Sequence, residues 1–302
     1  MVHLDVPGPD NGLFSTEEVR PRNKPALTTS RIIAFPKNHY QKPPNLAAGF
    51  SALDLSCEKP IRANLVADSI KPSSFKITIE TWADSVLHAA SATWIEHKAN
   101  ARDCPFGQFD TRDVDAAPKG AAGTPSSITT PRKETSKEIA FHTPFREAPQ
   151  LVCWLNRIDM GSGEDANYRI NAYATNVTAR SFVAHIDTWG DSVLNGAAMC
   201  WIAFPRNKAC VASGSFSTSD VRSWSNPRPK NSARVAFPKG AFTKPPTVLV
   251  ALNSLDMAGN SDLRIKASVD EVTSEGFRWH LDTWDDSTLY AAEASWIALG
   301  FA

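Results

Sequence analysis

The sequence predicts an all-β protein made of three tandem antiparallel β-sandwich domains. Short segments in which apolar and polar residues alternate are separated by turns rich in Pro and Gly, and one series of marker residues occurs three times along the 302 residues. Alternation with a period of two is typical of half-buried strands. No helical pattern persists beyond a couple of turns. A chain of this length accommodates three domains of about 100 residues each.

Each repeat begins at a glycine that precedes a Phe by two residues, in GLFSTEEVR at Gly12, GQFDTRDVD at Gly107 and GSFSTSDVR at Gly214. The markers that follow, in chain order, are Phe35, Phe141 and Phe237; Asp54, Asp159 and Asp256; Arg62, Arg169 and Arg264; Trp82, Trp189 and Trp284; and Trp94, Trp201 and Trp296. The Arg precedes the first Trp by 20 residues, and the first Trp precedes the second by 12, in every copy. Such agreement establishes an internal repeat.

The repeat spacing predicts the domain boundaries. We expect an N-terminal lead over residues 1–11 and three domains over residues 12–105, 107–210 and 214–302. The second domain is longer because of an insert near residues 115–135, whose Pro, Gly, Ala, Ser and Thr content is typical of a loop.

Strand parity predicts which repeated side chains are exposed, because successive residues of a strand point to opposite faces. In FRWHLDTW, Phe277 and Leu281 share one face, and the other carries Asp282 and Trp284. The equivalent segments FKITIETW and FVAHIDTW place Trp82 and Trp189 on the polar face in the same way. The repeated Arg also lies opposite the apolar residues of its strand. The second Trp of each repeat is predicted to be a core residue.

An Arg and a Trp on one exposed face suit two roles. A structural cation–π contact is the simpler one. Sugar binding is the other, since an indole stacks on the C–H face of a pyranose and a guanidinium donates hydrogen bonds to vicinal hydroxyls. The residues alone leave both open.

Catalytic and metal-binding patterns are not evident in the sequence. There is no nucleophile elbow, phosphate-binding glycine loop or HExxH motif. The carboxylates Asp282, Asp285 and Asp286, and the Asp-Ser pairs at Asp84, Asp191 and Asp286, are typical of turns. We therefore expect no enzyme activity, no metal site and no cofactor. A glycosidase would require two carboxylates flanking a cleft, which cannot be identified in the sequence.

The amino-acid composition limits which binding partners and which cellular compartment we expect. Lys+Arg and Asp+Glu both number 32, which offers no electrostatic argument for a nucleic-acid partner. No run of eighteen apolar residues predicts membrane insertion. Without a recognisable signal peptide at the N-terminus, we expect a cytoplasmic protein or one exported by an unconventional route. The five cysteines, Cys57, Cys104, Cys153, Cys200 and Cys210, are an odd number, and we expect reduced thiols.

The motif DTW-x-DS-x-L, followed after eight or nine residues by SWIA, resembles the H-type lectin domain, a family that includes snail agglutinins and the C-terminal domains of discoidins. The resemblance covers nearly the whole chain in three copies. It implies a six-stranded antiparallel sandwich per domain, trimeric assembly, and shallow sites near subunit interfaces that bind galactose or N-acetylgalactosamine.

The resemblance also implies site residues. The family's binding Arg matches Arg62, Arg169 and Arg264, its Trp matches Trp82, Trp189 and Trp284, and the residue after that Trp is Ala83, Gly190 or Asp285. A loop acceptor matches Asn226, and a Tyr supplied by the neighbouring subunit matches Tyr290, with His88 and Asn195 in the other copies. The third repeat thus has the most complete set: Asn226, Arg264, Trp284, Asp285 and Tyr290.

The sequence therefore predicts a multivalent lectin, an agglutinin whose partners are glycans or glycoconjugates. The alternative is an interaction or scaffold protein that keeps the lectin fold after some repeats have lost sugar binding. Two assemblies are open: a monomer in which the repeats form an intramolecular pseudo-trimer, or a homo-oligomer in which each domain trimerises with other chains.

Overall fold

A computed structural model describes residues 12–97, 103–115, 133–161 and 166–300. The lead over residues 1–11 and most of the expected insert near residues 115–135 lie outside the described residues. Within these ranges the chain forms eighteen β-strands, one short helix and two 3₁₀ turns, Thr16–Glu18 and Thr218–Asp220. The all-β prediction is confirmed.

The strands divide equally among the repeats. The first repeat contains β1 (Leu13–Ser15), β2 (Thr28–Ala34), β3 (Asn45–Leu55), β4 (Ile61–Asp68), β5 (Ser74–Glu80) and β6 (Leu87–His97). The second contains β7 (Phe106–Asp110), α1 (Arg112–Asp115), β8 (Glu134–Ala140), β9 (Gln150–Met160), β10 (Tyr168–Thr175), β11 (Ser181–Asp187) and β12 (Leu194–Phe204). The third contains β13 (Val211–Ser217), β14 (Ser232–Ala236), β15 (Thr247–Met257), β16 (Leu263–Asp270), β17 (Gly276–Asp282) and β18 (Leu289–Leu299).

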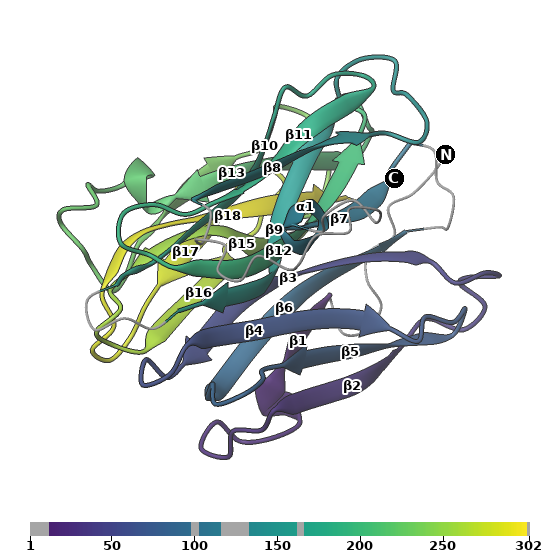
Figure 1. Ribbon diagram of the computed structural model, residues 1–302. Coiled ribbons are helices and arrows are strands. Elements are labelled where there is room, and N and C mark those ends of the chain that lie inside the picture. The colour runs from purple at the N-terminus through teal and green to yellow at the C-terminus, as the bar shows by residue number, and fades with distance from the viewer. Residues whose placement is uncertain (1–11, 98–102, 116–132, 162–165, 301–302) are drawn as a thin grey trace, which may run out of the picture.

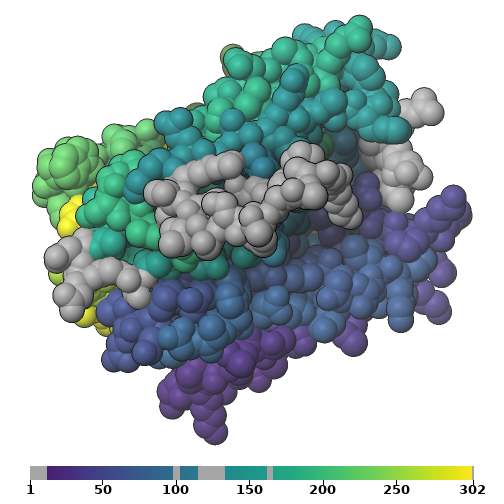
Figure 2. Space-filling view, viewed as in Figure 1, coloured from purple at the N-terminus to yellow at the C-terminus, as the bar shows by residue number. Residues whose placement is uncertain are grey.

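Each repeat is a sandwich of two three-stranded antiparallel layers, and each layer continues into a layer of a neighbouring repeat. The resulting six-stranded sheets have the orders β1-β6-β3-β16-β17-β14, β2-β5-β4-β9-β12-β7 and β13-β18-β15-β10-β11-β8. The junctions are the antiparallel pairs of β4 with β9, β10 with β15, and β16 with β3. The three repeats of one chain therefore close a ring, as expected for an intramolecular pseudo-trimer (Figure 1). Figure 2 shows the first repeat, purple to blue, packed along the teal second repeat.

The parity predictions hold in all three sandwiches. Phe277 and Leu281 are fully buried on one face of β17, whereas Asp282 and Trp284 are partly exposed. The second Trp of each repeat is a core residue, at 1%, 7% and 4% exposure for Trp94, Trp201 and Trp296. Each packs edge-on against a Phe near the start of a strand in the opposite layer, with ring centroids 4.9–5.2 Å apart.

A second apolar cluster lies where the repeats meet. It takes residues from the long strands β3, β9 and β15, which contact one another, and from β6, β12 and β18. Gly49, Trp154 and Ala251 occupy equivalent positions there. Trp154 is fully buried, and its Nε1 donates a hydrogen bond to the carbonyl of Ser295 at 3.0 Å. A Cβ atom on residue 49 would lie 2.4 Å from Cβ of Trp154 and 2.9 Å from that of Ala251. The centre accommodates one indole because the other two repeats supply small residues.

We predict that Gly49→Ala destabilises the protein by about 1–3 kcal/mol, the usual effect of overpacking a core. Urea unfolding measures the loss. In a Trp154→Gly background the same substitution should cost less, because the Cβ atom 2.4 Å away is gone and only that of Ala251, at 2.9 Å, remains. Equal losses in both backgrounds would contradict packing against Trp154.

We also predict that the protein is a monomer of 32.9 kDa in solution, since the pairing of the repeats is completed within one chain. Light scattering after size exclusion gives the mass. A discrete species of two or three chains would instead indicate that the repeats pair between chains.

Candidate functional site

The repeated Arg of each copy faces the repeated Asp of the next copy across a strand junction. The registers pair Arg62 with Asp159, Arg169 with Asp256, and Arg264 with Asp54. The Arg Nε atoms lie 3.6, 3.2 and 3.6 Å, respectively, from a carboxylate oxygen. We name these places the first, second and third sites, after the repeat that supplies the Arg. The sequence showed the Asp only as a marker, because its partner belongs to another repeat.

A turn within the Arg's own repeat holds the guanidinium from the other side. Nη1 donates to the Asp of the Asp-Ser pair, at 2.8 Å for Asp84 and 2.5 Å for Asp286, and equally to Asp191. The hydrogen bond from Arg62 lowers the pKa of Asp84. The Asp-Ser pairs thus close turns, as the sequence indicates, and also bind the Arg.

The repeated Trp follows directly on this framework. The Thr before it donates to the carbonyl of the Arg at 2.6, 2.6 and 2.5 Å in the three repeats. The residue after it has a left-handed backbone in every copy, with φ of 55° at Ala83, 63° at Gly190 and 53° at Asp285. This sharp turn leaves the indole at the rim of the sheet beside the Arg. Trp189 is 39% exposed, and Trp82 and Trp284 are partly exposed.

The first site is closed by a residue of the second repeat. The guanidinium of Arg157 lies over the ring of Trp82, with Cζ 5.5 Å from the centroid. Its side chain is 11% exposed and lies 3.7 Å from Asp110 and 3.9 Å from Asp159. Asn195 also donates to Asp159, at 3.2 Å. The structural cation–π contact considered from the sequence is therefore present here, but its cation is Arg157 rather than Arg62.

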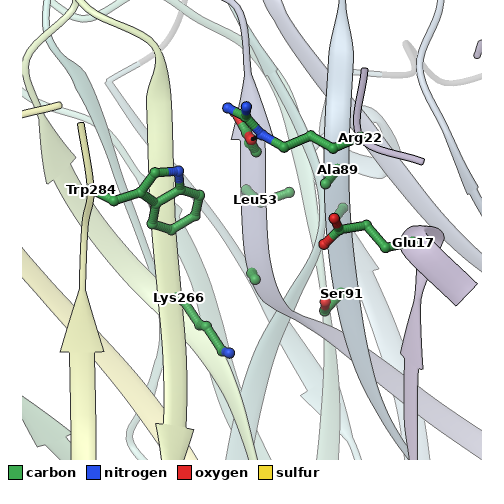
Figure 3. A pocket seen from close by; sticks show the side chains of 10 residues that line it. Glu17, Arg22, Leu53, Ala89, Ser91, Lys266 and Trp284 are labelled. Carbon is green, nitrogen blue, oxygen red and sulfur yellow. Dashed lines mark hydrogen bonds and ion pairs between the residues drawn. The ribbon is translucent and has the colours of Figure 1, made fainter. Parts of the chain in front are cut away.

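A pocket of about 330 Å³ between the third and first repeats shares Asp54 with the third site, and its lining includes Trp284 but not Arg264. Figure 3 shows Trp284 on one side and Arg22 and Glu17 on the other, with Lys266 below the indole. The floor consists of Ala52, Leu53, Asp54, Ala89, Ala90 and Ser91. Arg22, Glu17 and Lys266 were not predicted as site residues, since two of them belong to the opposite end of the chain.

Arg22 and Arg264 at the third site both form ion pairs with carboxylates. Nε of Arg22 donates to Asp54 at 2.5 Å, and the Asp54 side chain is only 3% exposed. Arg264 is held by Asp286, by Asp262 through Nη2 at 2.5 Å, and approaches Asp285 at 3.8 Å. The guanidinium of Arg264 is thus enclosed by carboxylates.

The second site is more open. The Asp256 side chain is 15% exposed, and within the described residues its Oδ2 has no hydrogen-bond partner. Burial raises the pKa of Asp256, although Arg169 opposes the shift. Nη2 of Arg169 is likewise without a partner in the described part of the chain. Gly190 leaves room for the guanidinium of Arg169, because a Cβ atom at residue 190 would lie 2.6 Å from Nη1 of Arg169.

The structure places Asn226 and Tyr290 away from the strand junction that contains Arg264. Ala291, next to Tyr290, pairs with Asp256, so Tyr290 lies at the second site. Asn226 belongs to the loop that Arg222 fastens to the carbonyls of Tyr290 and Leu289, at 2.7 and 2.8 Å, and its side chain is exposed. The prediction assumed that a repeat's loop serves its own Arg. In the ring, the loop of the first repeat instead serves the Arg of the third, because Arg22 contacts Asp54, which faces Arg264.

Comparisons with known proteins agree with this architecture. The family model of the H-type lectin domain matches residues 30–95, 136–204 and 232–299, about two thirds of the chain. The chain belongs to the H-type lectin family. The resemblance inferred from the sequence is thereby confirmed.

A curated relative gives a shorter match to this H-type lectin chain. A protein of Fuscovulum blasticum, described as "ATP synthase subunits region ORF 7", is 33% identical over 66 residues, which are 22% of this chain. The match spans 56% of that relative, so it covers little more than half of its length.

The described residues contain no helix that is long and apolar enough to cross a membrane. They also contain no group of three or more His, Cys, Asp or Glu side chains arranged to hold a metal ion.

Proposed function

We propose that the protein is a multivalent lectin that binds galactose-type or N-acetylgalactosamine-type glycans at its second and third sites. The observation that carries this proposal is the second site. There Trp189 is exposed, and its neighbours Thr188 and Gly190 adjoin Arg169. Within the described residues, Nη2 of Arg169 is a donor without a partner and Oδ2 of Asp256 an acceptor without one. Membership of the H-type lectin family supports carbohydrate as the ligand class.

The three groups match the surface of a pyranose. An indole face stacks on an apolar C–H face. A guanidinium only donates hydrogen bonds and an ionised carboxylate only accepts them, so together they complement two neighbouring hydroxyls, each of which does both. Galactose suits this arrangement because its axial 4-hydroxyl leaves the opposite ring face free for stacking. Both polar groups are held in place before the ligand arrives, which reduces the entropy lost on binding.

The alternative function, a lectin fold without sugar binding, is favoured at one site only. At the first site Arg157 covers a face of Trp82, and Asp159 already accepts a hydrogen bond from Asn195. A sugar would have to displace Arg157 from two carboxylates, Asp110 and Asp159. We therefore propose that the first site serves the stability of the ring, and that each chain binds two glycans.

We predict that Trp189→Ala and Trp284→Ala each remove one of two binding sites and that the double variant does not bind, whereas Trp82→Ala binds like the wild type. A glycan array followed by titration calorimetry measures ligand and stoichiometry. Trp82→Ala is a matched control, because it changes the same repeat position. A wild type that binds no glycan, or a double variant that binds unchanged, would contradict the proposal.

Binding at the second site should weaken on acidification, because protonation of Asp256 removes its charge as an acceptor. Its pKa is raised, so the loss begins at a higher pH than for an ordinary Asp, whose pKa is about 3.9. The affinity of Trp284→Ala, measured against pH, isolates this site. In an Asp256→Asn variant the remaining affinity should no longer change over that range. The same pH profile in both proteins would exclude Asp256 as the acceptor.

A further inference from the structure

Trp224 is the most exposed aromatic side chain among the described residues. It lies in the loop after the 3₁₀ turn Thr218–Asp220, and 65% of its surface is in contact with solvent. Single exposed apolar residues are ordinary features of protein surfaces. Trp224 differs from the other exposed apolar residues in its position within the repeat.

Internal symmetry fixes that position. Residues of the third repeat carry the numbers of the first plus 202, from Arg20 and Arg222 to Trp82 and Trp284, with no insertion between them. The backbone follows the same path in both loops. A capping box opens both 3₁₀ turns, and an equivalent turn follows, closed by Lys24 N to Pro21 O at 3.0 Å and Asn226 N to Ser223 O at 3.1 Å.

Side-chain contacts extend the equivalence. Arg20 donates to the carbonyls of His88 and Leu87 at 2.8 and 2.9 Å. Arg222 makes the same two bonds to Tyr290 and Leu289. The residue two positions further on is Arg22 in one repeat and Trp224 in the other. Trp224 therefore occupies the backbone position equivalent to that of Arg22.

Arg22 lies in the third site, where it contacts Asp54 and faces Trp284 across the pocket. The equivalent place at the second site lies beside Asp256 and opposite Trp189. An indole there does not neutralise the carboxylate, in agreement with the greater exposure of Asp256, 15% against 3% for Asp54. The third repeat thus has an apolar side chain, Trp224, where the first repeat has the charged Arg22.

We propose that Trp224 is a second stacking platform, and that the second site binds a neutral oligosaccharide rather than a single sugar. The terminal ring stacks on Trp189 and bonds to Arg169 and Asp256, and the next ring stacks on Trp224. A neutral second ring is favoured because the position offers an aromatic face in place of the Arg22 cation. This inference rests on the proposed function of the second site.

Calorimetry with galactose and lactose in a Trp284→Ala background tests the platform. Lactose should bind more tightly than galactose. Trp224→Ala should weaken lactose binding roughly threefold to tenfold, the effect of one aromatic contact, and leave galactose binding unchanged. Trp224→Phe should retain most of the lactose affinity. Val221→Ala, which shortens another exposed apolar residue of the same loop that belongs to no site, is the matched control and should alter neither affinity.

Failure of the inference is distinguishable from failure of the proposed function. If Trp189→Ala abolishes binding but Trp224→Ala changes neither affinity, or lowers both equally, the second platform is wrong and the lectin site stands. If neither sugar binds, or if Trp189→Ala binds unchanged, the proposed function fails and the inference fails with it. Circular dichroism of each variant checks that the fold is retained.

Discussion

The ring of three repeats depends on the packing of one indole at its centre. Trp154 fills a space that three equivalent positions share, and it fits because those positions in the other repeats are Gly49 and Ala251. Three copies of Trp could not occupy this place, since even a Cβ atom on residue 49 would lie 2.4 Å from Cβ of Trp154. The centre is thus asymmetric by composition. Such a core requires three different repeats in a fixed order, which a single chain supplies and a trimer of identical subunits cannot.

Ring closure determines what each candidate site contains. Because β4, β10 and β16 pair with strands of the next repeat, every Arg meets a carboxylate from another part of the chain. At the third site a loop residue of the first repeat, Arg22, joins them. The two halves of a site can therefore change independently in sequence. The results are an Arg that covers Trp82, a more exposed carboxylate at the second site and a charged pocket beside Trp284. One framework of Arg, Thr and Asp-Ser positions three chemically different surfaces.

Local regularities explain what could be predicted from the sequence. Strand parity placed Trp284 on the exposed face and Trp296 in the core, because alternation depends only on the strand itself. The recurrence of markers identified the three copies. Contacts between repeats were not predictable in this way, because nothing in a single repeat states which strand of another it pairs with. Tyr290 was consequently counted with the third repeat although its strand pairs with the strand of Asp256, and Arg157, Arg22 and Trp224 were not recognised as candidate site residues.

The difference between the second and third sites follows from how many donors of the Arg remain free. Arg264 is bound by Asp286 and Asp262 and lies near Asp54 and Asp285, so a sugar hydroxyl at its guanidinium must compete with carboxylates already in place. The second repeat has Asn167 and Gly190 where the third has Asp262 and Asp285, and Nη2 of Arg169 stays open. Asp285, one of the residues that make the third repeat look more complete in sequence, thus lies with Asp262 against the Arg of that repeat. A hydroxyl at Arg169 instead satisfies a donor that has no partner in the described residues, which is the more favourable exchange.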